Sequence, residues 1–349
     1  MTATGTWGEK PDKSSMLERP DYPDARILAG LEQHFDIQAQ VLTFLPLGAD
    51  ANTAVYQAIS QDGESVFVKL RLRNFSPFSV HLPHYLNLQG FQQVIAPRLT
   101  RSGSPWADLG EVKLIVLPFV GGRDGYEIAL SDENWIELGQ TIRKAHDLSL
   151  PDALRKQIPC DDYSLRYRQF LTGLLERADR MDSGDPILIQ MEESLRGHSG
   201  LLKDVLKRTG HLAQRLRDTP CEFVLCHADL HAGNVFIENG SGRLFILDWD
   251  DPVLAPRERD LMFPGGAQGF RGHTPEEEER LFMHGYGDVQ VDREALAYYR
   301  FERAIIDLAL FGEVICDAQE SAGNRAQALV YFNSNFLPGG TIERAYAVK

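Results

Sequence analysis

The chain has 349 residues, 43% of them hydrophobic and 25% charged, and its 50 acidic and 36 basic residues give a formal net charge of −14. This balance excludes a disordered or fibrous protein, and the length predicts about two domains. Apolar runs of about 18 residues are absent, which excludes a membrane-spanning helix. Residues 1–11 lack the apolar segment of a secretory signal, and the four cysteines lack CxxC spacing. We therefore expect reduced thiols and a cytoplasmic protein without a membrane partner.

The first third of the chain is predicted to be mostly strands. Residues 1–25 show little periodicity and predict a loose arm, which a short amphipathic helix follows at 27–35. Strands are expected at 41–47, 54–59, 65–70 and 113–117, with a hairpin turn at 60–63. A helix within residues 80–100 should end before Pro97. The proline and glycines of 118–125 predict a linker.

Beyond this linker the pattern is mainly helical. Ser131 is an expected N-cap, with acidic residues in the first turn, of a helix that extends to His146. A pair of helices is expected over 163–217, and residues 276–329 are mainly helical. Short strands are expected between these regions at 223–226, 235–237 and 244–247.

The order of elements predicts an α+β protein with two lobes. After the arm at 1–25 we expect a small antiparallel-β lobe at 26–118 and a larger, mainly helical lobe at 119–349. The first 118 residues hold 10 basic and 12 acidic residues, and the remainder holds 26 and 38. An acidic second lobe would attract a cationic small molecule, although solubility alone also explains the charge. A basic face is not visible, so no nucleic-acid partner is expected.

The segment 224–251 contains the residues best suited to catalysis. Asp229 and Asn234 stand five apart between two predicted strands, and Asp248 ends the next strand. Carboxylate and amide oxygens are ligands that Mg²⁺ prefers, and a separate carboxylate can orient and deprotonate an attacking hydroxyl. These are the groups that phosphoryl transfer requires. Asp250 and Asp251 follow, either as support for a metal or as solvated side chains.

The pattern His227-x-Asp229-x₄-Asn234, followed by Asp248-Trp249, resembles the catalytic motif of aminoglycoside phosphotransferases and choline kinases. The resemblance implies a two-lobed, protein-kinase-like fold. It also implies Asp229 as the catalytic base, Asn234 and Asp248 as Mg²⁺ ligands, and His227 as a residue that packs behind the loop. Asp260 matches a family position that braces this loop.

The N-terminal lobe agrees with the resemblance. Lys69 lies in an apolar predicted strand, where an unpaired ammonium is costly to bury, and in the family this lysine contacts nucleotide phosphates. An edge-strand lysine at the surface is the alternative. Further candidates for the nucleotide site are the loop 48–53, with Asn52 and Thr53, and the linker residues Pro118, Phe119 and Val120, which fall where the family binds adenine.

One feature departs from the family pattern. Kinase-like enzymes usually pair the strand lysine with a glutamate on the following helix, but no acidic residue lies between Lys69 and Asp108. Gln89, Gln92 and Gln93 are candidate substitutes. The missing glutamate bears on the geometry expected around Lys69 in the nucleotide lobe. It does not bear on the catalytic motif at 227–249.

The resemblance is strongest to spectinomycin phosphotransferases, in residues 117–126, 134–139, 226–235 and 248–266. It implies transfer of phosphate from ATP, with GTP not excluded, to a hydroxyl of a cationic aminocyclitol, in the presence of Mg²⁺ and without a phosphoenzyme. We expect a monomer or homodimer. Candidate contacts to the acceptor are Asp229, Asp288, Tyr298, Glu302 and Asp307.

Other functions fit parts of the same pattern. Within the family, the acceptor is choline, ethanolamine, a sugar amine or a protein hydroxyl in other members, and a catalytically silent binding module is a further alternative. A zinc-dependent hydrolase would use Cys226, His227, Asp229 and His231. That hypothesis leaves Lys69, Asn234 and Asp248 unexplained.

Overall fold

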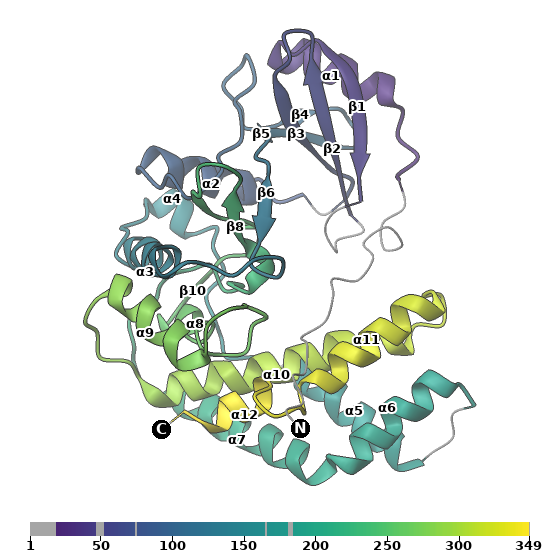
Figure 1. The fold of residues 1–349 in the computed structure, drawn as a ribbon, viewed down its shortest axis with the longest axis vertical. Coiled ribbons are helices and arrows are strands. Elements are labelled where there is room, and N and C mark those ends of the chain that lie inside the picture. Colours follow the sequence, from purple (N-terminus) through teal and green to yellow (C-terminus); the bar gives the residue numbers. More distant parts are fainter. Residues whose placement is uncertain (1–18, 47–51, 74, 165, 181–183, 349) are drawn as a thin grey trace. The chain divides into compact units, whose positions relative to one another are not determined.

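The computed structural model describes residues 19–46, 52–73, 75–164, 166–180 and 184–348. The chain separates into two compact units (Figure 1). Unit 1 comprises Met1–Leu130, Leu150–Ile158 and Ala232–Pro252, and unit 2 comprises Ser131–Ser149, Pro159–His231 and Val253–Lys349. The predicted catalytic segment is therefore divided, with Asp229 in unit 2 and Asn234 in unit 1. The lobe boundary after residue 118 stays a prediction, and most of the predicted arm lies outside the described residues.

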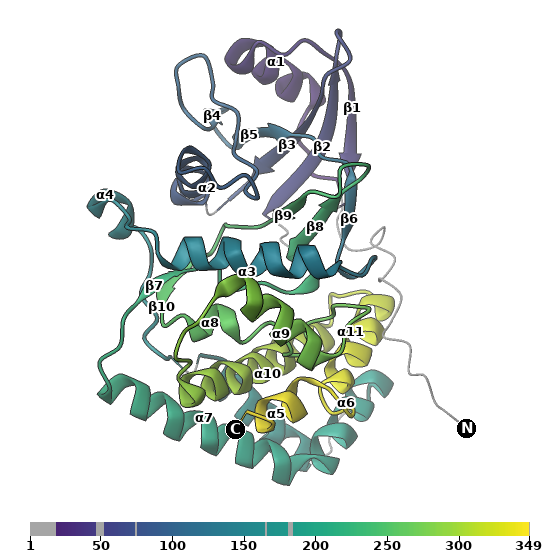
Figure 2. The ribbon, with the colours of Figure 1, turned by 60° about the vertical axis from the view of Figure 1, so that its left-hand side comes forward.

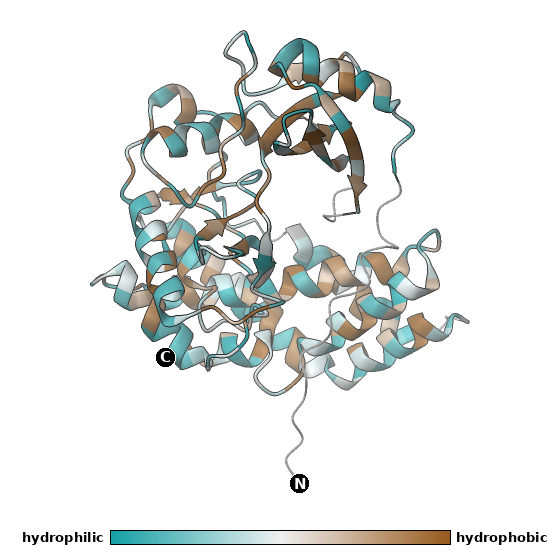
Figure 3. Ribbon diagram, turned by 45° about the horizontal axis from the view of Figure 1, so that its top comes forward, coloured by the Kyte–Doolittle hydropathy of each residue, from teal (hydrophilic) through white to brown (hydrophobic). Residues whose placement is uncertain are grey.

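Unit 1 is built on an antiparallel sheet with the strand order β1-β2-β3-β5-β4. Its strands are β1 (Ala39–Leu45), β2 (Thr53–Ser60), β3 (Ser65–Arg71), β4 (Ala107–Asp108) and β5 (Lys113–Pro118). The predicted hairpin is confirmed, because β2 pairs with β3 across a turn in which Gly63 has a φ of 85°. The strands are mostly hydrophobic (brown in Figure 3), as expected of a sheet that packs into a core.

Alternation along β3 decides which side chains enter the core of unit 1. Val66, Val68 and Leu70 are buried, whereas Lys69 points to the opposite face. The buried residues pack with Ile27 of α1 (Asp24–Phe35), so the predicted N-terminal helix covers the apolar side of the sheet. A second helix, α2 (Phe78–Leu88), ends well before Pro97, as predicted.

A smaller sheet in unit 1 positions two of the candidate metal ligands. It has the antiparallel order β6-β8-β9, formed by β6 (Gly122–Asp124), β8 (Val235–Glu238) and β9 (Leu244–Ile246). Asn234 directly precedes β8, and Asp248 comes two residues after β9. The predicted linker therefore contains a strand, β6. A side chain at Gly122 would overlap the carbonyl oxygen of Ile237, so the pairing requires glycine there.

Unit 2 is mainly helical, with a pair of short strands, β7 (Val224–Cys226) and β10 (Val253–Ala255). The N-cap at Ser131 is confirmed, because its hydroxyl accepts a hydrogen bond from the Asn134 N–H at the start of α3 (Asp132–His146). The helices after β10 are α8 (Glu258–Leu261), α9 (Pro275–Tyr286), α10 (Arg293–Cys316), α11 (Ala322–Ser334) and α12 (Thr341–Tyr346).

The prediction of two helices over 163–217 was wrong, because three form there. They are α5 (Arg166–Arg180), α6 (Pro186–Gly197) and α7 (Ser199–Asp218). Asp185 caps α6 by accepting from the N–H groups of Ile187 and Leu188, and Pro186 occupies its first position. These helices bury Leu171, Leu195 and Val205 in a core shared with α10.

Glycines allow α3 and α9 to pack closely, and Figure 2 shows the two helices side by side. A Cβ at Gly139 would overlap the carbonyl oxygen of Phe282, and a Cβ at Gly285 would overlap that of Ile136. Each helix therefore meets the backbone of the other with no side chain between them.

Among the described residues, no helix is both long and apolar enough to cross a membrane.

Gly139→Ala should destabilise the protein by about 2 kcal/mol or more, because the added methyl group must push α3 and α9 apart. Gly173→Ala on α5 is the matched control: open space surrounds that position, so the better helix propensity of alanine should add up to about 1 kcal/mol. Thermal unfolding measures both, and equal effects of the two substitutions would contradict the close helix contact.

Candidate functional site

A buried carboxylate holds the loop that follows β7. Asp260 on α8 is 0% exposed. One of its oxygens accepts from the N–H of His227 at 2.9 Å, and the other accepts from the N–H of Ala228 at 2.7 Å. These bonds fix Ala228 at a φ of 70°, a left-handed conformation that costs a non-glycine residue free energy. The loop that carries Asp229 is thereby held in a strained shape.

His146 completes the surroundings of Asp260. Its Nε2 lies 3.1 Å from Asp260 Oδ2 and its Nδ1 lies 2.7 Å from the hydroxyl of Tyr286. Because a carboxylate only accepts, Nε2 carries the proton and Nδ1 accepts from the tyrosine. Burial alone would raise the pKa of Asp260, but the bond from His146, together with nearby His227 and the N–H of Ala228, holds that pKa below its usual range.

The zinc hypothesis does not match this geometry. In the described part of the chain, one group of His, Cys and acidic side chains is close enough to share a metal ion. It consists of His146, Cys226 and Asp260, whose ligand atoms all lie within 4.8 Å of one another. His227, Asp229 and His231 are not part of it. The Asp260 oxygens are already used by backbone N–H groups and His146, so this group is a structural network.

Asp229 lies on the same loop, half exposed, between two basic side chains. Arg303 Nη1 is 2.7 Å from its Oδ1, and His231 Nε2 is 3.4 Å from its Oδ2. Burial raises the pKa of Asp229, but the hydrogen bonds and charges of His231 and Arg303 outweigh it and hold the pKa well below the ordinary value. The carboxylate is therefore ionised throughout the neutral range, as an acceptor of protons must be.

In unit 1 the lysine of β3 has an unexpected partner. Lys69 Nζ lies 2.6 Å from Asp250 Oδ2, and Arg71 Nη1 lies 3.8 Å from the same oxygen. The acidic partner of Lys69 is thus Asp250, 181 residues away, and not a glutamate on the helix that follows β3. None of the three candidate glutamines, Gln89, Gln92 or Gln93, is the residue that pairs with Lys69 here. The sequence does not reveal this role, because Asp248 and Asp251 also offer carboxylates within two residues of Asp250.

Asn234 and Asp248 are set by the small sheet of unit 1. Asn234 ends the turn η2 (Ala232–Asn234), and its carbonyl accepts from the N–H of Leu247 at 2.8 Å. Asp248 is exposed and has a φ of 62°, while the ring of Trp249 next to it is buried. A carboxylate and an amide from one sheet form a hard-oxygen donor set that fits Mg²⁺.

The other nucleotide-site candidates also belong to unit 1. The Asn52 carbonyl accepts from the N–H of Leu72, and the Thr53 hydroxyl accepts from Arg71 Nη1 at 2.6 Å. Pro118 ends β5, and Phe119 and Val120 follow it, each partly exposed. Residues 48–51 of the predicted phosphate loop lie outside the described residues.

The acceptor-site candidates differ widely in their surroundings. Tyr298 is completely buried and donates to Glu302 Oε1 at 2.7 Å, so its phenol offers no surface to an acceptor. Glu302 also pairs with Arg259 at 2.6 Å. Asp307 pairs with Arg303 at 2.9 Å, which places it beside Asp229, and Asp288 lies exposed after α9.

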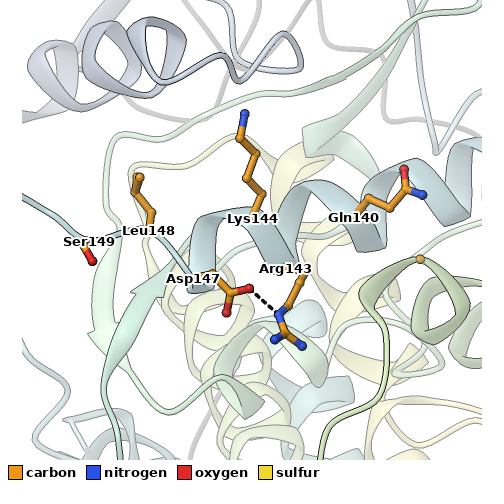
Figure 4. A pocket seen from close by; sticks show the side chains of 7 residues that line it. Gln140, Arg143, Lys144, Asp147, Leu148 and Ser149 are labelled. Carbon is orange, nitrogen blue, oxygen red and sulfur yellow. Dashed lines mark hydrogen bonds and ion pairs between the residues drawn. The ribbon is translucent and has the colours of Figure 1, made fainter.

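A surface pocket of about 530 Å³ lies at the C-terminal end of α3 (Figure 4). Arg143 and Asp147 form an ion pair at 2.6 Å in its wall. The lining residues are Gln140, Arg143, Lys144, Asp147, Leu148, Ser149 and Gly285. None of the predicted site residues lines this pocket, so it does not belong to the candidate site.

Comparison with known proteins agrees with this residue pattern. The model of the phosphotransferase enzyme family matches residues 43–299. The crystal structure of spectinomycin phosphotransferase APH(9)-Ia with ADP and spectinomycin is 29% identical with a TM-score of 0.86, over 95% of this chain and 99% of that one. The AMP-bound complex of the same enzyme is 28% identical with a TM-score of 0.83, over 93% and 98%.

A more distant structure shares the fold alone. Choline kinase LicA from Streptococcus pneumoniae is 15% identical with a TM-score of 0.53, over 89% of this chain and 99% of that one. No individual curated protein matches the chain significantly. The predicted α+β, kinase-like fold is confirmed by these structures.

Asp260→Ala should destabilise the protein by about 3 kcal/mol or more, because it leaves the N–H groups of His227 and Ala228 and the imidazole of His146 without their acceptor. Asp260→Asn retains one carbonyl oxygen as an acceptor and should destabilise the protein less than Asp260→Ala. Thermal unfolding of both variants measures the difference. Unfolding temperatures that match the unsubstituted protein would mean that the loop holds its shape without this carboxylate.

Proposed function

The chain belongs to the phosphotransferase enzyme family, and on this premise we propose that it transfers the terminal phosphoryl group of ATP to a hydroxyl of a cationic small molecule. The observation that supports this most directly is the ionised carboxylate of Asp229 on a strained loop held by Asp260. An ionised, oriented carboxylate is what the deprotonation of an attacking hydroxyl requires.

Unit 1 carries the residues proposed for the nucleotide. Lys69 binds its phosphates, and Asp250 keeps the ammonium extended from β3 through their 2.6 Å ion pair. Backbone groups near Asn52 and Thr53 and in residues 118–120 are the proposed contacts to the phosphates and the base. Asn234 and Asp248 would hold Mg²⁺, which neutralises negative charge on the phosphates when bound.

The proposed chemistry is a direct in-line transfer. Asp229 orients the acceptor hydroxyl and takes its proton. As it does so, the hydroxyl oxygen bonds to the terminal phosphorus and the bond from that phosphorus to the bridging oxygen breaks. The products are ADP and a phosphomonoester, and no phosphoenzyme forms. His227 supports the loop by accepting the Asp229 N–H at Nδ1, at 3.2 Å.

Spectinomycin is the first candidate acceptor. The 29% identical relative was crystallised with ADP and spectinomycin, and a dicationic aminocyclitol suits a chain with a net charge of −14. Asp229, Asp307, Glu302 and Asp288 are the proposed acidic contacts. Other cationic alcohols such as choline, ethanolamine and sugar amines remain alternatives, as does a protein hydroxyl, because local contacts set the acceptor within this fold. GTP as donor, a cytoplasmic location and a monomeric or dimeric state stay predictions.

Purified protein with Mg·ATP should release ADP faster when spectinomycin is present, with a product heavier by one phosphoryl group. Kanamycin, choline and no addition are the parallel samples. Stimulation by a different compound would keep the kinase and replace the acceptor. ATP binding without turnover on any acceptor, protein substrates included, would favour a catalytically silent module.

In the same assay, Asp229→Asn should bind nucleotide normally and lose about 10²-fold or more in turnover, because the amide cannot take the proton. Turnover at the rate of the unsubstituted enzyme would show that another group is the base.

Asp248→Ala should weaken Mg²⁺-dependent nucleotide binding by about 10-fold or more, because it removes one of the two proposed protein ligands. Calorimetric titration with a non-hydrolysable ATP analogue, with Mg²⁺ and with EDTA, measures this. Asp108→Ala, which removes an exposed acid of unit 1 that pairs with Lys113, is the matched control and should bind normally. Equal Mg²⁺ dependence in both variants would remove Asp248 from the metal site.

A further inference from the structure

Arg303 links two carboxylates of unit 2 through one guanidinium group. Its Nη1 lies 2.7 Å from Oδ1 of Asp229, and its Nε lies 2.9 Å from Oδ1 of Asp307, one turn further along α10. Both distances are short enough for charge-assisted contacts. Arg303 also lies beyond residues 43–299, the span that the family model matches, so the family motif does not include it.

Contacts other than the one to Asp229 also fix the position of the Arg303 guanidinium. Asp307 holds it along α10, and the ring of Phe263 covers it with its centre 5.8 Å from Cζ. The Arg303 side chain is 21% exposed and that of Asp307 is 14% exposed, so surrounding protein atoms restrict the motion of both side chains. A planar guanidinium held on one edge and one face presents its remaining N–H groups in a fixed direction.

The charged groups that face Asp229 come from two elements. His231, on the same loop, lies 3.4 Å from Oδ2, whereas Arg303 and Asp307 face it from α10. Burial raises the pKa of Asp229, and His231 and Arg303 lower it. Burial likewise raises the pKa of Asp307, against the effect of Arg303, and the charge of Asp229 adds to the rise. One arginine therefore stabilises the negative charge on both acids.

We propose that Arg303 is a positioning residue for the catalytic base: it holds Oδ1 of Asp229 at 2.7 Å, so that Oδ2, which has the longer 3.4 Å contact with His231, is the oxygen that takes the acceptor proton. Asp307 acts through Arg303 by holding the guanidinium in place. This inference rests on the proposed role of Asp229 as the base. It adds a residue, outside the matched family span, that determines the orientation and the charge of that base.

Two substitutions of Arg303 test the proposal through enzyme kinetics. With spectinomycin as acceptor, Arg303→Met should lower kcat by about 10- to 100-fold, while the KM for ATP changes less than about 2-fold, because the nucleotide residues lie in unit 1. The acid limb of the kcat–pH profile should move to higher pH, since a cation that favours ionised Asp229 is gone. Arg303→Lys restores one positive charge and should recover part of both effects.

A second measurement needs no acceptor. In protein labelled with ¹³C at the aspartate carboxyl carbon, the Asp229 resonance is assigned by its loss in Asp229→Asn. Its titration midpoint should be higher in Arg303→Met than in the unsubstituted protein, and intermediate in Arg303→Lys. If Arg303→Met does not fold, the shift in Arg303→Lys decides, because that variant retains a charge but not the double contact.

Arg325→Met is the matched control for the loss of a partly buried arginine–aspartate pair. Arg325 pairs with Asp185 at 2.8 Å in unit 2, away from the catalytic loop in sequence and in its contacts. Its kcat, acid limb and Asp229 resonance should equal those of the unsubstituted protein. A fall in kcat without any change in acid limb or titration midpoint in Arg303→Met would overturn the proposal. An active Asp229→Asn would instead overturn the base, and with it the proposed function.

Discussion

The geometry of the loop that carries Asp229 depends on one buried anion, Asp260. Asp260 has no contact with solvent, yet it stays charged because two backbone N–H groups and one imidazole point at it. An isolated carboxylate in this place would be expelled or protonated. If the loop left its strained conformation, the buried Asp260 carboxylate would lose its hydrogen bonds from His227 and Ala228. The strained backbone at Ala228 therefore persists, and it fixes the direction in which Asp229 projects.

Each unit contains a partly exposed charged side chain, among the candidate site residues, that is held by an ion pair. In unit 1 a cation, Lys69, projects from an apolar strand and is held by an anion, Asp250. In unit 2 an anion, Asp229, projects from a loop and is held by a cation, Arg303. Both partners come from remote parts of the sequence, and neither pair is fully buried.

The parts of this protein that the sequence predicts are those encoded by neighbouring residues. The N-cap at Ser131 and the hairpin before Ser65 are local patterns, and the structure contains both of them. The strand β6 was missed because its pairing partner β8 is more than a hundred residues away and its own composition indicates a turn.

Ion-pair partners are still less predictable. In the sequence, Asp250 and Asp251 are alike as candidates for metal support or for solvated side chains, and only the fold pairs Asp250 with Lys69. Arg303 lies 74 residues from Asp229 on a helix whose pattern is set by core packing, so nothing local marks it. By contrast, the sequence does mark the start of α6, the additional helix within 163–217. Asp185 followed by Pro186 is a helix N-terminus pattern, but the apolar periodicity of the region obscured it.

The division of the chain into units also limits how such a protein can diversify. Each unit is assembled from three separate stretches of polypeptide, and the boundary between residues 231 and 232 falls between Asp229 and Asn234, inside the proposed catalytic motif. A single crossover between two genes could not transplant either unit intact, and a fragment ending at any one boundary would lack part of its own core. A substitution within one stretch, for example on α10, leaves this interrupted framework unchanged.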